Sequence, residues 1–260
     1  MEFFFEKKQP SMSLLWFAYH GITFFPTFAH ASLMTHLKLN SQTDSPMRII
    51  EKGKNKDEII KLLKGTKREY IEDVIEELCE NGFFEAPAST RFHLNMEGGL
   101  AQHSLNVCKM GIMLRKQLLL EDPELTELLP EDSVIIVSLL HDVCKSDIYK
   151  KCLKKRKNNF GQWEDVEGYE VDYKNFPLGH GEKSVIMVLR MGFNLTDEEI
   201  MAMRWHMSAW DLAFQSPDIK GNYNKAKEIC PLCALLQCAD NLAANIIERE
   251  DEEDVLIQKF

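Results

Sequence analysis

The 260-residue sequence lacks the long hydrophobic runs and the excess of positive charge that mark several large protein classes. Its most apolar early stretch, residues 12–34, is interrupted by His20 and Pro26, whereas a clean membrane span needs about 20 uninterrupted apolar residues. The formal net charge of -10 repels nucleic-acid phosphates, although a basic run covers residues 150–157 and acidic residues crowd the segment from Glu248 to Asp254. We therefore expect no membrane segment and no duplex nucleic acid partner.

The cysteines lack the spacing of a disulfide framework, because the seven of them are scattered and their number is odd. The close pair Cys230 and Cys233 has no second pair to complete a zinc site and no strand context typical of a redox motif. We interpret the two as core cysteines at the start of a helix, where cysteine behaves as a small hydrophobic residue. This usage favours a reducing, cytoplasmic compartment.

The first 46 residues differ from the remainder of the chain. Two lysines precede the apolar stretch and Ala29-His30-Ala31 follows it, which is the outline of a signal peptide. A weakly ordered extension, or a natural start at Met47 behind an over-extended gene start, is the interpretation that we favour over secretion. The expected organisation is an N-terminal extension over residues 1–46 and one helical domain over residues 47–260.

Helical periodicity dominates the chain from about residue 56, with apolar positions recurring at three- and four-residue spacing. This spacing, with the cap and stop signals beside it, predicts helices over residues 56–64, 67–82, 96–120, 132–144, 180–191, 196–205 and 231–249, and a short one between Pro123 and Pro130. Alternation within residues 155–178 predicts a hairpin or an extended loop, and the polar residues 211–229 predict a loop. The fold class is therefore all-α, with one small extended insertion.

Four reactive side chains lie on predicted helices that are otherwise apolar: His103, His141, Asp142 and Asp240. A buried carboxylate without a partner costs several kcal/mol, in order of magnitude, so such positions need compensation. A single histidine or aspartate of this kind is more often a satisfied core residue, but the combination on three helices is less expected by chance. A bound divalent cation would resolve all of them, because imidazole nitrogen and carboxylate oxygen suit zinc, manganese or iron.

The segments around these residues resemble the signature segments of the HD superfamily of metal-dependent phosphohydrolases. They are MEGGLAQHSLN at residues 96–106, SLLHDVCK at residues 138–145 and QCADNLA at residues 237–243. The resemblance covers roughly residues 95–250. It implies an HD-type helical bundle in which one metal is held by the four side chains His103, His141, Asp142 and Asp240.

Two more histidines, His180 and His206, fall between the His-Asp pair and Asp240. Dinuclear members of the superfamily carry two extra histidines in this interval, so the resemblance implies a second metal with Asp142 as the bridging ligand. The alternative, in which these histidines contact substrate phosphate or are buried polar groups beside a single metal, stays open. We expect one or two divalent ions of manganese, iron, zinc, nickel, cobalt or magnesium.

Three cationic side chains near these residues are candidates for binding substrate phosphate. Lys145 follows His141 by four residues and is able to project from the same helical end, so we expect it to act with Asp142 in catalysis. Lys183 and Arg204 are weaker candidates, although the guanidinium of Arg204 suits a bidentate contact with phosphate. The simpler interpretation of Lys145 is a solvated lysine at a helix end.

The basic run 150–157 and the aromatic residues Trp163, Tyr169 and Tyr173 follow the His-Asp helix. They are able to form a lid that presents positive charge and a stacking surface to a nucleobase. A solvated charged loop with a few packed aromatic residues is an equally good interpretation.

The favoured function is a metal-dependent phosphohydrolase, a phosphomonoesterase or a phosphodiesterase, that cleaves a small phosphorylated substrate, with a nucleotide favoured. One alternative is a di-iron oxygenase, which a minority branch of the superfamily represents; Lys145 and the basic run argue for phosphate instead. Another is a non-catalytic nucleotide-binding regulatory module, which the complete set of ligand positions disfavours. The sequence does not determine the oligomeric state.

Overall fold

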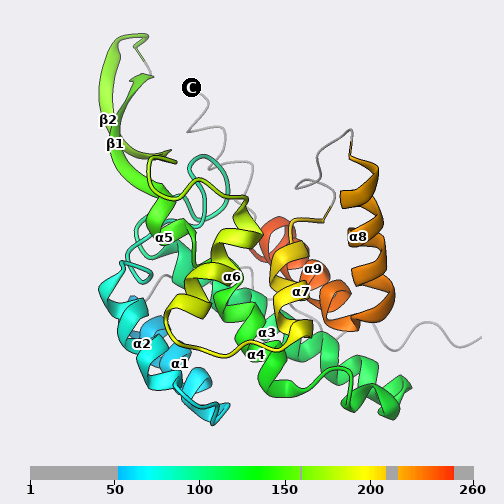
Figure 1. Cartoon of the computed structure of the whole chain (residues 1–260). Helices are drawn as coiled ribbons and strands as arrows, with labels where there is room; N and C mark the ends of the chain where they lie inside the picture. Colours follow the sequence, from blue (N-terminus) through cyan, green and yellow to red (C-terminus); the bar gives the residue numbers. More distant parts are fainter. Residues whose placement is uncertain (1–51, 159, 209–215, 249–260) are drawn as a thin grey trace, which may run out of the picture. The chain divides into compact units, whose positions relative to one another are not determined.

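The computed structural model describes residues 52–158, 160–208 and 216–248, and these residues form a bundle of helices from which one hairpin projects (Figure 1). The helices are α1 (Lys52–Gly65), α2 (Ile71–Glu80), α3 (Gly99–Glu121), η1 (Pro123–Thr126), α4 (Glu131–Leu140), α5 (Lys145–Ile148), α6 (His180–Arg190), α7 (Asp197–Trp205), α8 (Pro217–Ile229), α9 (Pro231–Leu242) and the π-helical turn η3 (Ala243–Ile247). The hairpin consists of β1 (Tyr149–Lys157) and β2 (Trp163–Val171). The all-α architecture with a small extended insertion is confirmed, whereas the proposed extension over residues 1–46 lies outside the described residues.

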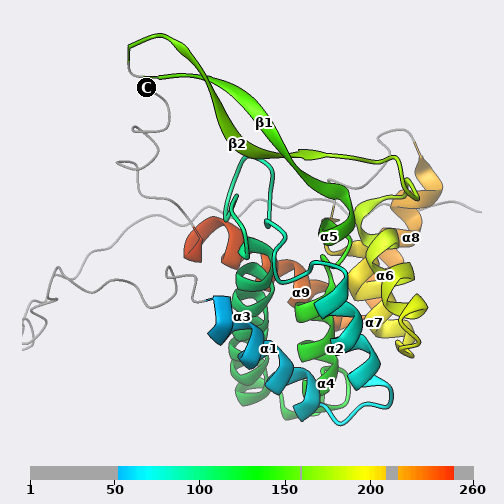
Figure 2. The same cartoon turned by 90° about the vertical axis from the view of Figure 1, so that its left-hand side faces the viewer.

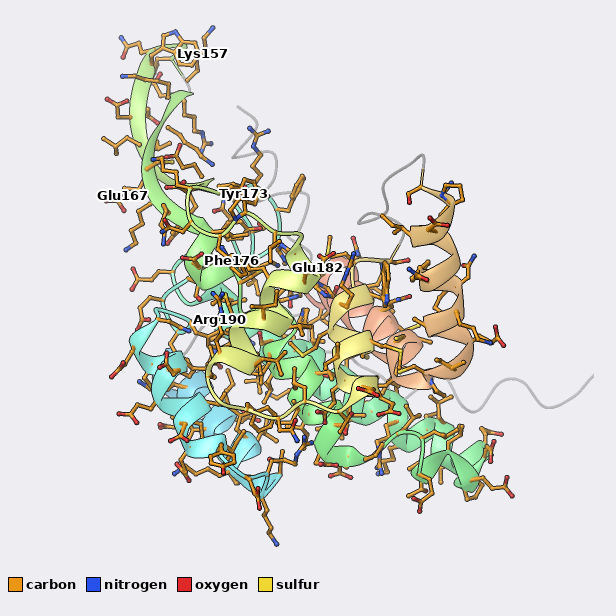
Figure 3. The ribbon with its side chains drawn as sticks, viewed as in Figure 1. Lys157, Glu167, Tyr173, Phe176, Glu182 and Arg190 are labelled. Atoms are coloured by element: carbon orange, nitrogen blue, oxygen red, sulfur yellow. The ribbon has the colours of Figure 1, made fainter. Side chains whose placement is uncertain are left out.

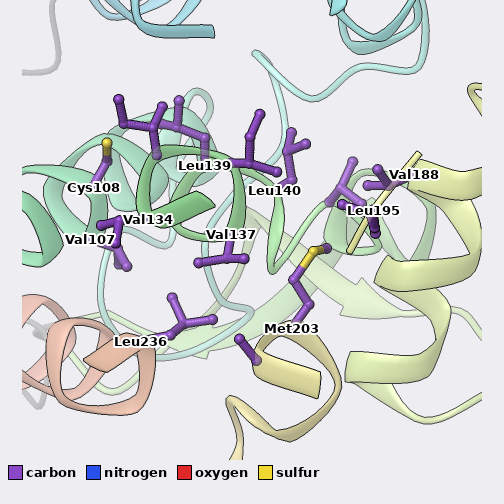
Figure 4. Packing of buried hydrophobic residues seen from close by; sticks show 14 of the residues in the cluster. Val107, Cys108, Val134, Val137, Leu139, Leu140, Val188, Leu195, Met203 and Leu236 are labelled. Atoms are coloured by element: carbon purple, nitrogen blue, oxygen red, sulfur yellow. The ribbon is translucent and has the colours of Figure 1, made fainter. Parts of the chain in front are cut away.

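The core forms where α3, α4, α7 and α9 pack together, and Figure 4 shows Val107, Val134, Leu236 and Met203 from these four helices. Helix α4 buries every residue from position 133 to position 140, as a helix that is apolar on all sides must. Helix α3 approaches α4 closely at Gly111, where an added Cβ would lie 3.1 Å from a side-chain atom of α4. The core therefore brings the chain segments that follow α4 and α7 close to α3 and α9.

Helix α4 ends before the His-Asp pair, not after it. The prediction of one helix over residues 132–144 is wrong at its C-terminal end, because α4 stops at Leu140. The amides of Val143 and Lys145 then donate to the carbonyls three residues earlier, which tightens the chain into a turn before α5. His141 and Asp142 consequently lie at the end of a buried helix, where their side chains face neighbouring helices.

The hairpin starts earlier than the alternation pattern predicts. Strand β1 begins at Tyr149 and pairs in antiparallel register with β2 (Figure 2). Basic residues of β1 stand opposite acidic residues of β2, for example Lys155 opposite Asp165 and Arg156 opposite Glu164. Figure 3 shows Lys157 and Glu167 on this arm, away from the bundle. Three of the six basic residues of the run, Lys150, Lys155 and Arg156, therefore stand opposite an acidic residue, and the run is a strand instead of a loop.

A helix, α8, occupies most of the segment that the sequence predicts as the loop 211–229. Ser216 caps it through its hydroxyl, which accepts from the amide of Ile219, and Pro217 occupies its first turn. Only Tyr223 and Ala226 are buried, so the apolar period that would have indicated a helix is weak. The prediction is wrong for residues 217–229, whereas residues 211–215 lie outside the described residues.

Two local predictions are confirmed. Thr196 and Glu199 form a reciprocal capping box at the start of α7, with each side chain accepting from the backbone amide of the other residue. Cys230 and Cys233 are fully buried, and Cys230 is the N-cap of α9. These two cysteines pack in the core, as the sequence interpretation states.

Among the described helices, none alone has the length and hydropathy of a membrane span, although α8 and the segment Pro231–Ile247 reach that threshold jointly across a bend of 99°.

Candidate metal centre

All six predicted metal ligands converge at one end of the bundle. His103 comes from α3, His141 and Asp142 from the turn after α4, His180 from the first position of α6, His206 from the position after α7, and Asp240 from α9. Five of them, together with Lys145, line a cavity of about 640 Å³; these are His103, Asp142, His180, His206 and Asp240. His141 lies behind them and is fully buried.

The carboxylate of Asp142 stands between two sets of histidines. Its Oδ2 atom lies 3.4 Å from Nε2 of His103 and 3.2 Å from Nε2 of His141. Its Oδ1 atom lies 2.5 Å from Nε2 of His180 and 3.5 Å from Nε2 of His206. One carboxylate oxygen is thus directed to each set, which is the arrangement that a bridging ligand needs.

The carboxylate of Asp240 completes the first of these sets. Its Oδ1 atom lies 3.3 Å from Nε2 of His103 and 4.0 Å from Nε2 of His141. The ligand atoms of these three residues all lie within 4.8 Å of one another, and the same holds for His141, Asp142 and His206. The site therefore contains two overlapping groups of ligand atoms, each close enough to hold an ion.

Three histidines make their hydrogen bonds through Nδ1, which leaves the Nε2 atom of each ring available to coordinate a metal. Nδ1 of His141 donates to the Ser138 carbonyl at 2.9 Å, and Nδ1 of His206 donates to the Met203 carbonyl at 2.7 Å. Nδ1 of His103 lies 3.1 Å from both carboxylate oxygens of Glu248. A neutral imidazole that donates from Nδ1 presents a lone pair at Nε2.

These Nε2 atoms fit a metal. In His103, His141 and His206 they are buried and have no hydrogen-bond partner among the described residues. Buried polar atoms are rarely left unpaired, and metal-ligating histidines characteristically donate their other nitrogen to a carbonyl or a carboxylate. Together with the oxygens of Asp142 and Asp240, the three nitrogens form a donor set suited to a divalent transition metal.

The charged groups around Asp142 and Asp240 favour the ionised form of both carboxyl groups. Burial alone would raise the pKa of Asp142, but Lys145, His141 and His180 hold this pKa well below its ordinary value. Burial opposes a low pKa at Asp240 as well, and the neighbouring histidines lower it nevertheless. Both groups are therefore present as carboxylates, the form that binds a cation.

Lys145 is buried at the cavity wall as a cation. Its Nζ atom lies 2.6 Å from Oδ2 of Asp142, and its side chain is 9% exposed. Burial would lower its pKa, but the charge of Asp142 raises this pKa above the ordinary value of a lysine. The structure thus places Lys145 at the predicted position, beside the carboxylate between the two histidine sets.

The structure does not bring Lys183 and Arg204 to the cavity. The ammonium of Lys183 is buried in an ion pair with Asp147 and also donates to the carbonyl of Asn175 at 2.9 Å. Arg204 pairs with Glu182, which Figure 3 labels on α6, and its guanidinium lies 4.0 Å from the centroid of the Trp205 ring. Neither is among the described residues that line the cavity, so Lys145 is the better candidate for a phosphate contact.

Two residues of the site have no counterpart in the sequence prediction. Glu248 receives the Nδ1 hydrogen bond of His103, although the sequence shows it only as the start of an acidic run. His93 lies on the cavity wall, and its Nε2 atom is 3.8 Å from the Glu248 carboxylate. It comes from the irregular segment before α3, where no periodicity marks an inward side chain.

Comparison with known proteins agrees with this geometry. No curated protein and no solved structure matches the chain. The family model described as the HD domain matches residues 100–245, which is more than half of the chain and includes all six ligand candidates. The chain therefore belongs to the HD domain family, whose members are generally metal-dependent hydrolases.

Proposed function

We propose that this protein is a metal-dependent phosphohydrolase that cleaves a phosphate ester of a small molecule, most favourably a nucleotide, with a metal-activated water. The observation that carries the proposal is the combination of unpaired buried Nε2 atoms with two carboxylates and one buried ammonium group at a single cavity. The imidazoles and carboxylates account for metal binding, and the ammonium accounts for an anionic substrate.

Two metal positions are supported by the distances around Asp142. The first would be held by His103, His141, Asp240 and Oδ2 of Asp142. The second would be held by Oδ1 of Asp142 with His180 and His206. When bound, divalent ions of this kind polarise a phosphoryl oxygen and lower the pKa of a coordinated water towards neutrality.

Lys145 has the properties of a phosphate-binding group in this reaction. Its ammonium is charged, it lies at the cavity wall, and Asp142 holds it at 2.6 Å. A fixed cation beside the ligand set can neutralise charge that develops on the phosphoryl oxygens as the ester bond breaks. We assign Lys145 to substrate binding and catalysis, with Asp142 as both a ligand and the group that orients it.

The cavity also has walls that suit the organic part of a substrate. Its volume of about 640 Å³ lies within the range of small-molecule sites. Phe92, Tyr149 and Met207 contribute to its lining, and the side chain of Phe92 is 77% exposed. An aromatic wall of this type can stack on a nucleobase, which supports a nucleotide as substrate. The negative net charge of the chain argues against a long nucleic-acid substrate.

Phosphate release in the presence of a divalent metal tests this function. Protein purified without chelator is expected to contain a divalent metal and to release phosphate from at least one nucleotide when manganese is added. The screen should cover nucleoside monophosphates and diphosphates directly, and cyclic nucleotides with a coupled phosphatase. Bound metal without hydrolysis of any of these would contradict the nucleotide phosphohydrolase.

The number of metals is tested by replacing His206 with alanine. Because Nε2 of His206 lies 3.5 Å from Oδ1 of Asp142, the carboxylate oxygen assigned to the second ion, we expect the variant to retain one ion per chain and lose the other. Elemental analysis after dialysis gives the stoichiometry. Ser208→Ala is a matched control, since Ser208 is two residues away and shares a hydrogen bond with Tyr223 instead. Equal stoichiometry in the wild type and in His206→Ala would refute the two-metal arrangement.

A further inference from the structure

A row of buried side-chain hydrogen bonds connects α1 to the metal centre. Asn55 of α1 donates to Gln102 at 2.8 Å, Gln102 donates to Asn106 at 2.9 Å, and Asn106 donates to Glu248 at 3.0 Å. Glu248 in turn accepts from Nδ1 of His103. All five side chains belong to residues that are at most 8% exposed. A polar row of this extent in a protein interior is costly unless every member is satisfied.

The direction of the row is fixed by the carboxylate at its end. Glu248 offers only acceptor oxygens, so the amide of Asn106 must donate to it through Nδ2. The Oδ1 atom of Asn106 must then accept from Gln102, and the same reasoning applies between Gln102 and Asn55. The three amides therefore have one consistent orientation, which restrains the carboxylate of Glu248.

The π-helical turn η3 brings Glu248 onto the face of Asp240. The amide of Glu248 donates to the carbonyl of Ala243, five residues earlier, at 2.9 Å. In a regular α-helix, residues eight apart differ by about 80° around the axis, whereas residues seven apart differ by about 20°. A π turn absorbs one residue, so Glu248 takes approximately the angular position of the seventh residue after Asp240. Turns of this kind occur frequently at functional sites.

His103 depends on a side-chain acceptor for its Nδ1 atom more than His141 and His206 do. His141 and His206 follow helix ends and donate to carbonyls three residues earlier on their own segments. His103 lies inside α3, where neighbouring carbonyls accept the hydrogen bonds of the helix itself. Its Nδ1 atom therefore needs an acceptor from elsewhere, and Glu248 supplies one from 145 residues along the chain.

We propose that Glu248 is a positioning residue of the metal centre, restrained by the row Asn55, Gln102 and Asn106, and that it holds His103 with the proton on Nδ1 and with Nε2 directed to Asp142 and Asp240. A carboxylate on the far nitrogen fixes the ring of a metal-ligating histidine and makes it a stronger donor. The proposal rests on the metal-binding part of the proposed function and is independent of the substrate.

The alternative role for Glu248 is that of a direct metal ligand. The ligand atoms of His93, His103 and Glu248 also lie within 4.8 Å of one another, so this group is a further candidate for an ion. Such an ion would compete with the hydrogen bond between His103 and Glu248, and His103 already directs Nε2 to Asp142 and Asp240. The positioning role explains both nitrogens of His103, and we adopt it.

To test this role, the full chain is freed of metal with a chelator and titrated with manganese in a calorimeter, which measures the affinity for the metal. We expect Glu248→Ala to weaken the affinity of the site that contains His103 by about 10- to 100-fold, because it removes the acceptor for Nδ1. Glu248→Gln retains an acceptor oxygen, so its loss should be smaller. Glu58→Gln is the control, since Glu58 also connects α1 with α3 but through an exposed ion pair with Lys109.

Nitrogen NMR supplies a second readout that does not depend on activity. The resonances of His103, assigned by their loss in His103→Gln, should indicate a proton on Nδ1 in the wild type and in Glu248→Gln, and a mixture of tautomers in Glu248→Ala. An unchanged manganese affinity together with an unchanged tautomer in folded Glu248→Ala would overturn the proposal. Loss of one whole ion in both Glu248→Ala and His93→Ala would also overturn it, in favour of a direct ligand. Neither readout involves substrate, so failure of phosphate release leaves this test intact.

Discussion

Replacement of Asp142 by alanine is expected to abolish both bound metal and turnover. No other described residue faces both histidine sets, because Oδ2 of Asp142 is directed to His103 and His141 while Oδ1 is directed to His180 and His206. Its removal would disrupt both proposed metal positions and leave Lys145 without its carboxylate partner. We expect kcat/KM to fall by about 1,000-fold or more, which corresponds to about 4 kcal/mol of transition-state stabilisation.

The isosteric change Asp142→Asn separates this effect from loss of the fold. Lys145 is buried, so its unpaired charge in Asp142→Ala is itself destabilising. The asparagine variant preserves the shape of the side chain and an acceptor for Lys145, but it removes the negative charge that binds a cation. Asp165→Asn is a suitable control, because Asp165 is half exposed in the hairpin and pairs with Lys155. Metal content, phosphate release and thermal unfolding should be measured for all three variants. Normal metal and normal turnover in Asp142→Asn would show that the ligand assignment is wrong.

The residues of the candidate metal centre stand out in the sequence because a buried position conflicts with the polarity of their side chains. Histidines and aspartates on apolar helices need a partner, and the helical period shows from sequence alone that His103 and Asp240 lie on such faces. The structure brings all six candidates together around the carboxylates of Asp142 and Asp240, and it also brings Lys145 to the cavity. The position of Lys145, four residues after His141, was informative because the chain between them turns tightly.

The partners of the other cations could not be predicted, because they come from distant segments. Lys183 is held by Asp147, which lies 36 residues earlier, and Arg204 is held by Glu182, which lies 22 residues earlier. No local spacing distinguishes a lysine that faces a cavity from one that is paired inside the bundle. The sequence therefore predicted cationic candidates near the site without showing which of them reaches it.

Strand β1 and helix α8 differ from the predicted elements for a common physical reason. Strand β1 carries charged residues on both faces, and helix α8 buries only Tyr223 and Ala226. Periodicity arises from burial on one face, so elements that remain mostly exposed show little of it. The sequence does not indicate the position of Glu248 for a related reason, since the π-helical turn shifts this residue away from the face that a regular α-helical period would assign.

The largest stability effect is expected at Arg68, where Arg68→Met should destabilise the fold by about 3–5 kcal/mol. Arg68 donates to Glu199 at 2.7 Å and 3.2 Å, and it also donates to the carbonyl of Asn194. The carboxylate of Glu199 is fully buried and accepts from Ser133 at 2.8 Å. Methionine retains the apolar stem but removes the cation, so the variant leaves a buried carboxylate without its charged partner. The pair connects the segment before α2 with the start of α7.

Urea unfolding followed by circular dichroism measures this change, and Glu131→Gln provides the comparison. Glu131 also pairs with an arginine, Arg115, but its side chain is 61% exposed, so its loss should cost less than about 1 kcal/mol. Adding Glu199→Gln to Arg68→Met should restore part of the lost stability, because it removes the uncompensated charge while its amide can still accept from the backbone at the capping box. If Arg68→Met alone unfolds within 1 kcal/mol of the wild type, the buried pair does not hold these two segments together.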